Sequence, residues 1–340
     1  SDGQTLYVVL AGSDLVEVVD VSDPDRPRLV KFLPAGRNPR GLALSRDGRR
    51  GYVMSYLARS VTVLDLEKLE PIAEVPVTTE TLDPEVLRGK TLFNNASNPR
   101  LSQGSWISCA SCHPDGGADS VTWLFPDGPR QTPALWYAGQ TRPWHWSAAL
   151  DEAQDVEETI QLIQHGLGLA PGTDPPLLGP PNAGRSADLD ALAAFLERGI
   201  RPAIPPPPAG DLSQGRGLFQ TAGCVQCHGG PRWTSSAMPG PAGTLDPDGN
   251  GMVDAVLRDV DTLNPLDVRG ASGFDPPSLL GVGLTAPYLH DGSMPTLEAL
   301  LASGHPDPQG SGNSLHAEEI AALAAFLRSI GRDTPPIEAP

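Results

Sequence analysis

Two short segments of the 340-residue chain share one pattern, C-x-x-C followed directly by His. They are "SCASCHPDG", with Cys109, Cys112 and His113, and "GCVQCHGG", with Cys224, Cys227 and His228. These are the only four cysteines of the chain. Covalent haem attachment uses this pattern, because two thiols add to the vinyl groups and the next His ligates the iron. The sequence therefore predicts two covalently bound c-type haems.

Two other uses of paired cysteines fit the pattern less well. A redox dithiol needs no His after the motif and is typical of a strand-to-helix turn, whereas helix-like sequence precedes both motifs. A zinc site built from all four cysteines would leave the two matched His without a role. Haem attachment is the reading that uses every residue of the pattern.

Composition excludes several classes of partner. The formal net charge is −17, which disfavours binding to nucleic acid or to anionic lipid. The chain has 37 Gly and 37 Pro but only 5% aromatic residues, so loops are abundant and the conventional core is thin. Two haems would supply part of the missing apolar bulk.

The sequence also bears on the compartment. No stretch approaches the roughly 18 consecutive apolar residues that a membrane-spanning helix needs. The first residues, "SDGQTLYVVL", lack the basic and apolar regions of a signal peptide, so we expect a mature or truncated form. Because bacteria attach c-type haem outside the cytoplasm, we expect an exported protein, periplasmic or extracellular.

The first 79 residues contain a β-strand repeat. Residues 2–21 and 47–66 match at a period of 45 residues, and both contain β-branched runs followed by turn residues. This period predicts about two propeller-type blades. Two blades cannot close a ring, so either further blades precede them or the pair packs as a small β layer. An ordinary β meander remains the alternative.

From about residue 80 the pattern becomes helical, and a second repeat appears. Residues 132–146 match 276–290, and the amphipathic segment 186–202 matches 316–333. The predicted fold is therefore mainly α, with two tandem cytochrome c-like domains after the small all-β segment at 1–79. Their predicted bounds are 80–203 and 211–340, with a Pro-rich linker at 204–210.

The elements around the motifs are more specific than the motifs. "DGPRQTPAL" follows the first and "LTAPYLHDGSMPTLEAL" follows the second. Over about residues 80–332 the chain resembles the bacterial di-haem cytochrome c peroxidase and MauG family, and the β segment looks like a propeller sometimes fused to such enzymes. The resemblance implies that the first haem reacts with hydrogen peroxide and the second relays electrons from a redox partner, a cytochrome or a cupredoxin. It also implies a calcium ion and a tryptophan between the haems.

The resemblance assigns roles to individual residues. His113 and His228 become the proximal iron ligands. The tryptophan between the haems falls on Trp146, although Ser147 and Ala148 replace the family's Asp-Gly, and a core aromatic is the alternative. The calcium ligands of the family fall on Gln131, Thr285 and Pro287. Gln131 replaces an Asn, so its amide reaches further; oxygen-only ligation suits a hard cation.

At the distal side of the first haem the sequence departs from the family. The removable distal His falls on Trp123, which cannot ligate iron, and a Glu that assists O–O cleavage falls on Leu169. His165 is the nearest replacement as a proton shuttle. It could equally be a sixth iron ligand or a polar loop residue. Glu157 and Glu158 are further candidates.

At the second haem the family's distal ligand falls on Gly304, which has no side chain. His305 is one residue away, and we predict that it ligates this iron opposite His228. Met294 and His316 are the alternatives.

A further calcium candidate lies at 244–256, where Asp246, Asp248 and Asn250 give the opening of an EF-hand loop. Position twelve is Leu257 instead of the bidentate Glu, so a solvated turn competes with this site.

Two classes of function follow. One is a di-haem redox enzyme that reduces peroxide or oxidises a partner. The other is a non-enzymatic electron-transfer cytochrome with both irons six-coordinate. The retained two-domain pattern and the missing distal His favour the enzyme.

Overall fold

The computed structural model describes residues 3–125, 127–174, 177–202, 204–205, 210–236, 243, 257–258, 273–305 and 315–338. The chain forms two compact units. The first joins Ser1–Ala110 to Ile160–Gly168, and the second joins Ser111–Thr159 to Leu169–Pro340. The predicted domain bounds stay predictions. Of the predicted calcium candidates, Asp246, Asp248 and Asn250 lie outside the described residues, as does most of the Pro-rich linker.

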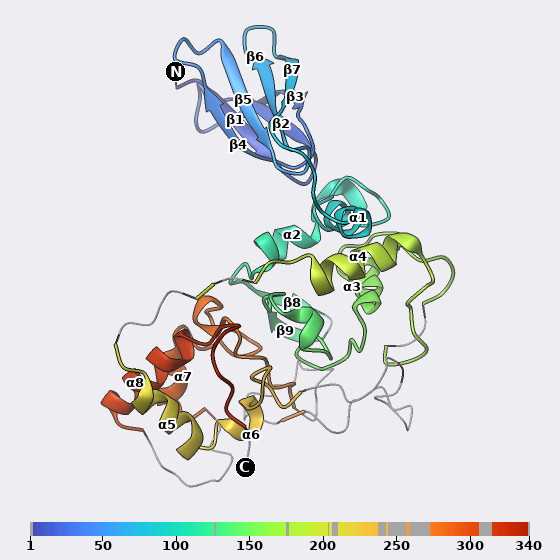
Figure 1. The fold of residues 1–340 in the computed structure, drawn as a ribbon. Coiled ribbons are helices and arrows are strands. Elements are labelled where there is room, and N and C mark those ends of the chain that lie inside the picture. Colours follow the sequence, from blue (N-terminus) through green and yellow to red (C-terminus); the bar gives the residue numbers. More distant parts are fainter. Residues whose placement is uncertain are drawn as a thin grey trace. The chain divides into compact units, whose positions relative to one another are not determined.

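The first unit begins with two antiparallel sheets (Figure 1). One has the order β1-β2-β3 and the other the order β4-β5-β6-β7. The strands are β1 (Thr5–Leu10), β2 (Leu15–Asp20), β3 (Arg28–Pro34), β4 (Pro39–Leu44), β5 (Arg50–Ser55), β6 (Ser60–Asp65) and β7 (Glu70–Pro76). β5 and β6 begin 45 residues after β1 and β2, which is the repeat period of the sequence.

Alternating burial explains how the two sheets pack. Val16 and Val18 of β2 are buried, while the residues between and beside them are partly exposed. They share one core with Leu33, Val53 and Leu64. Period-two alternation of this kind is what a sheet with one covered face requires.

Helices dominate after residue 80. They are α1 (Pro84–Phe93), α2 (Cys109–Cys112), α3 (Val156–Leu162), α4 (Ala187–Arg198), α5 (Ser213–Thr221), α6 (Val225–His228), α7 (Leu297–Ala302) and α8 (Ala317–Arg328). Short 3₁₀ turns lie at Gln103–Ser105, Pro114–Gly116, Ala138–Gln140, Ala153–Asp155 and Val282–Leu284. The predicted helices at 186–202 and 316–333 are α4 and α8. One element was not predicted: β8 (Thr122–Phe125) and β9 (Gly128–Gln131) form an antiparallel hairpin after the first motif.

The sequence repeat in the second unit is also a backbone repeat, with an offset of 144 residues. The 3₁₀ turns 138–140 and 282–284 correspond. The isolated bridge Trp144–Leu150 corresponds to Tyr288–Met294. Residues at equivalent positions, His145 with Leu289 and Ala148 with Gly292, all have positive φ. Such a conformation is uncommon for non-glycine residues, so its recurrence shows that both segments follow the same path.

Each copy of this segment packs on a helix through a glycine. A Cβ added to Gly139 would lie 2.3 Å from the carbonyl oxygen of Glu197 in α4. At the equivalent Gly283 it would lie 2.8 Å from the Cα of Arg328 in α8. In both copies the backbone of the turn therefore touches the last turn of the helix, and only glycine leaves room for the contact.

This contact generates a stability prediction. Gly139→Ala should lower the free energy of unfolding of the haem-loaded protein by about 1–3 kcal/mol, because backbone has to move away from backbone. The matched control is Gly217→Ala in α5, where an added Cβ meets nothing within 4 Å. It should raise the same free energy by about 0.5–1 kcal/mol through helix propensity. Denaturant titration measures both, and equal effects of the two substitutions would contradict the packing argument.

Candidate functional site

The first cysteine of each motif is poorly suited to thiolate chemistry. None of the four cysteines forms a disulfide. Burial raises the pKa of Cys109 to about 11 and the pKa of Cys224 to about 11. Redox dithiols and zinc-bound cysteines need an accessible thiolate, which a depressed pKa provides. Among the described residues there is also no group of three or more His, Cys, Asp or Glu side chains that could hold a metal ion.

The two motif histidines share one orientation. His113 Nδ1 lies 3.3 Å from the carbonyl oxygen of Gly117, and His228 Nδ1 lies 3.0 Å from that of Pro277. Burial lowers the pKa of each ring to about 4, so both are neutral at physiological pH. A neutral ring that donates Nδ1–H to a carbonyl keeps the lone pair on Nε2. This is the tautomer that an iron ligand requires, so both sites fit a c-type haem.

Apolar surface near the first motif supports this fit. Within the first unit, an isolated bridge between Ser102 and His165 aligns the segment before Cys109 with residues 160–168. Large apolar side chains on these two segments are exposed to solvent: Trp106 is 56% exposed and Leu167 is 77% exposed. Exposed apolar side chains around a ligand site are typical of a surface that a bound group covers.

His165, the predicted proton shuttle or sixth ligand, has its side chain exposed and a positive φ of 53°. Its neighbour Gln164 is buried, and the Gln164 amide lies 3.8 Å from the sulfur of Cys109. The residue is therefore on the segment that reaches the first motif, and its role stays a prediction.

His305, the predicted ligand of the second iron, is partly buried. Its pKa is lowered to about 3, first by burial and then by electrostatic interaction with the His228 ring when both are protonated. Of the alternatives, His316 is the N-cap of α8, where its N–H donates to the carboxylate of Glu319 at 2.8 Å.

Trp146 is partly buried and lies at one end of an aromatic group centred on His290. Its indole Nε1–H donates to the carbonyl oxygen of Gln131 at 2.9 Å. Its ring meets the ring of His290 edge-on at 6.4 Å between centroids, and the His290 ring stacks on Phe274 at 3.8 Å. Trp146 thus connects the repeated segment 132–146 to its second copy, 276–290.

The predicted calcium ligands Gln131 and Pro287 face the same point. A Cβ added at Gly292 would lie 3.2 Å from Pro287 Cγ and 3.6 Å from Gln131 Cγ. Gln131 is 3% exposed, and its side-chain nitrogen has no hydrogen-bond partner among the described residues. The orphaned atom is a hydrogen-bond donor, so it fits an ordered water or another acceptor here and is not itself a calcium ligand.

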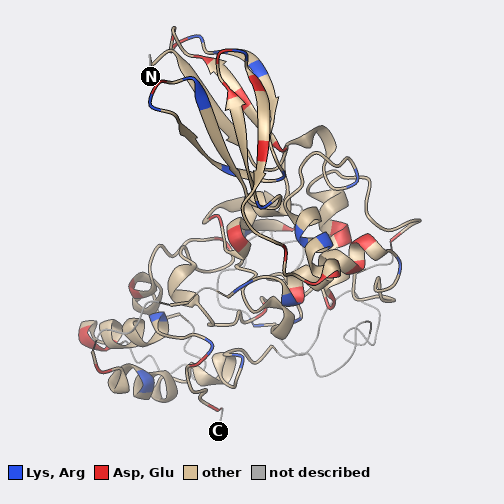
Figure 2. Cartoon of the chain, turned by 45° about the horizontal axis from the view of Figure 1, so that its top comes forward, with Lys and Arg blue, Asp and Glu red and all other residues tan. Residues whose placement is uncertain are grey.

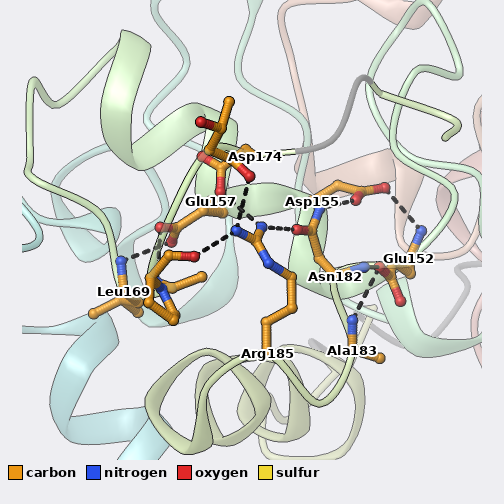
Figure 3. Close-up of polar contacts among 11 residues, drawn as sticks. Glu152, Asp155, Glu157, Leu169, Asp174, Asn182, Ala183 and Arg185 are labelled. Carbon is orange, nitrogen blue, oxygen red and sulfur yellow. Dashed lines mark hydrogen bonds and ion pairs between the residues drawn. The ribbon is translucent and has the colours of Figure 1, made fainter. Parts of the chain in front are cut away.

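Buried carboxylates anchor the loop that contains Leu169 (Figure 3). Glu157 is fully buried, and its two oxygens accept the backbone N–H groups of Leu169 and Ala170, each at 2.9 Å. Farther along the loop, Glu152 accepts the N–H groups of Asn182 and Ala183. Figure 2 shows further acidic residues on the neighbouring helix α4. Glu157, a predicted alternative proton donor, is thus engaged as an anchor.

Sequence reasoning missed three acidic residues near these sites. Burial raises the pKa of Asp155 to about 6. Asp275 donates its backbone N–H to the carbonyl of Trp146 at 2.7 Å, and burial raises its pKa to about 8. Asp119 accepts the indole N–H of Trp123 at 2.9 Å. Only Asp155, in an acid-rich segment, had a signal in the sequence.

The chain is similar to several known proteins. The model of the RoxA-like, cytochrome c-like family matches residues 273–307. Cytochrome c551 peroxidase of Nitrosomonas europaea is 26% identical and aligns over 81% of this chain and 87% of its own length. Methylamine utilization protein MauG of Methylorubrum extorquens is 27% identical over 65% of this chain and 68% of its own length.

The fold has solved neighbours. A MauG-like protein associated with microbial copper homeostasis superposes with a TM-score of 0.51 and 23% identity, covering 76% of this chain and 92% of that one. Hydrazine synthase of Kuenenia stuttgartiensis gives a TM-score of 0.52 at 16% identity, covering 75% and 90%. The sequence matches confirm the resemblance that the motifs predicted: this chain is similar to the bacterial cytochrome c peroxidase and MauG proteins.

Proposed function

We propose that the chain is a di-haem c-type redox protein that reduces hydrogen peroxide, or oxidises a partner, at the first haem with electrons relayed through the second. The observation that carries this proposal is the matched pair of neutral motif histidines, each with Nδ1 at a backbone carbonyl and Nε2 available to iron. A carrier with both irons six-coordinate is the alternative that the experiments below decide.

The residues that would hold the haems are those of the motifs. Cys109 and Cys112 would form the thioether bonds of the first haem, and Cys224 and Cys227 those of the second. A bound haem supplies redox chemistry at iron. The chain fixes each ring of His113 and His228 by a carbonyl, which raises the basicity of the ligand nitrogen.

Several finer points belong to the same proposal. We infer two tandem cytochrome c-like domains, supported by the 144-residue backbone repeat. Seven antiparallel strands with a 45-residue repeat support blade-like sheets at the N-terminus. Calcium at Gln131, Thr285 and Pro287 would neutralise charge between the haems. No described helix is long and apolar enough to span a membrane. We propose a periplasmic location and a cytochrome or cupredoxin as redox partner, from the resemblance.

The first test concerns cofactor and reaction together. A pyridine haemochrome assay should give two covalent haems per chain, and one after replacement of Cys224 and Cys227 by Ala. Visible and EPR spectra should then show a high-spin first haem that changes with stoichiometric peroxide. Two low-spin haems without a peroxide response would favour the carrier, and stoichiometric zinc would end the haem proposal.

The second test addresses His305. Imidazole is a strong-field ligand, so His305→Ala should convert one low-spin haem to high-spin in the EPR spectrum. The matched control is His316→Ala, which keeps the backbone N–H that donates to Glu319 and should leave the spin state unchanged. An unchanged spectrum in His305→Ala would transfer the role to another residue, with Met294 next to be tested.

The third test addresses Trp146 as a relay. An indole between two haems divides one long electron transfer into two short ones, so Trp146→Phe should slow the reoxidation of a reduced second haem after peroxide is added. Stopped-flow spectroscopy measures this rate with both haems still bound. A packing role predicts only a small loss of stability, and wild-type kinetics in the variant would assign Trp146 to packing.

A further inference from the structure

The structure contains a second tryptophan whose indole N–H donates to a different kind of acceptor. Among the described indole groups, the N–H of Trp144 donates to the carbonyl of Ala138 and that of Trp146 to the carbonyl of Gln131. The N–H of Trp123 instead donates to the carboxylate oxygen Oδ2 of Asp119, at 2.9 Å. A backbone carbonyl is too weakly basic to take up a proton, whereas a carboxylate can accept one.

The position of Asp119 is fixed by the fold. Its second oxygen, Oδ1, accepts the backbone N–H of Val121 at 3.0 Å, two residues along, which closes an Asx turn at the entry to β8. Trp123 is the second residue of β8 and pairs with Arg130 of β9. Local structure therefore fixes the backbone of both partners and the Asp119 carboxylate.

The pair is close to the first haem-binding motif and reaches the surface. The carbonyl oxygen of Gly117, two residues before Asp119, lies 3.3 Å from Nδ1 of the motif histidine His113. Trp123 and Asp119 are each partly exposed. Beside Trp123, the side chain of Leu124 is 75% exposed. An oxidisable ring that borders both a haem site and solvent can pass electrons between them.

We propose that Trp123 and Asp119 form a proton-coupled electron-transfer pair through which an external electron donor reaches the first haem. This inference rests on the proposed function, because hydrogen peroxide is the oxidant. Each peroxide molecule takes up two electrons and two protons to give two water molecules. Trp123 supplies one of these electrons, and its Nε1–H proton moves to Asp119 Oδ2 across the hydrogen bond. The donor then returns an electron to the indole, and the proton moves back to nitrogen.

Trp123 thereby differs from Trp146. Oxidation of Trp146 leaves the proton on nitrogen, since its partner is a neutral carbonyl, and the positive charge stays inside the protein. Oxidation of Trp123 produces a neutral indolyl radical beside a protonated carboxyl. No net charge is left in the pair, which avoids the cost of a new charge in a partly buried site.

The test uses the haem-loaded protein and rapid-freeze EPR after one equivalent of hydrogen peroxide. Protein with indole-deuterated tryptophan identifies the tryptophan signal. We expect a neutral tryptophan radical in the wild type that is lost in Trp123→Phe. Asp119→Asn keeps the size of the side chain and removes the proton acceptor, so the neutral radical should be lost there too. The matched control Trp144→Phe removes an indole whose N–H donates to the carbonyl of Ala138 and should leave the signal unchanged.

Two outcomes overturn the pair: a tryptophan signal that persists in Trp123→Phe, or a wild-type neutral radical in Asp119→Asn. If the wild type does not react with peroxide, the proposed function fails. The proton transfer between Trp123 and Asp119 can then be tested by a second experiment. Pulse radiolysis with azide radicals oxidises tryptophan without peroxide. The yield of long-lived radical should then fall equally in Trp123→Phe and Asp119→Asn, and equal yields in all proteins would refute the pair.

Discussion

The hydrogen bond from each motif histidine to a backbone carbonyl is the interaction on which the site depends. A neutral ring that donates Nδ1–H to this carbonyl keeps its lone pair on Nε2, so the bond sets the tautomer before any cofactor arrives. The two acceptors, Gly117 and Pro277, stand in different relation to their motifs. Gly117 follows His113 within the same loop, whereas Pro277 belongs to the second copy of the repeated segment. The second site is therefore completed only when residues 49 positions apart meet.

The glycine contacts extend this dependence to the helices. Gly139 and Gly283 bring each repeated segment onto the last turn of α4 or α8. In the second copy Phe219, Trp233 and Phe326 pack edge to face with centroids 5.5 to 5.9 Å apart, and they hold α5 against α8. Helix packing and the glycine turn thus belong to one continuous arrangement, which explains why the sequence repeats these two features together.

Much of this could be predicted from the sequence because the signals are local. The haem motifs, the strands at a 45-residue period and the amphipathic helices at 186–202 and 316–333 are each contained in a short stretch. The hairpin β8–β9 escaped prediction because "DGPRQTP" reads as a turn. Asp119 and Asp275 escaped because a turn visible only in three dimensions, or a partner distant in the sequence, gives each its role. The distal residues His165 and His305 were assigned from their position in the sequence relative to the family pattern. Such a position does not say which way a side chain points.

The carboxylates that hold the loop after Leu169 determine how much the sequence of that loop can vary. Glu157 and Glu152 hold mostly backbone N–H groups, which every residue except proline provides. The loop can therefore change its side chains and still be held in the same place by the same acids. Sequence drift along these positions would alter the surface that the loop presents, while the path of the backbone is conserved by residues outside it.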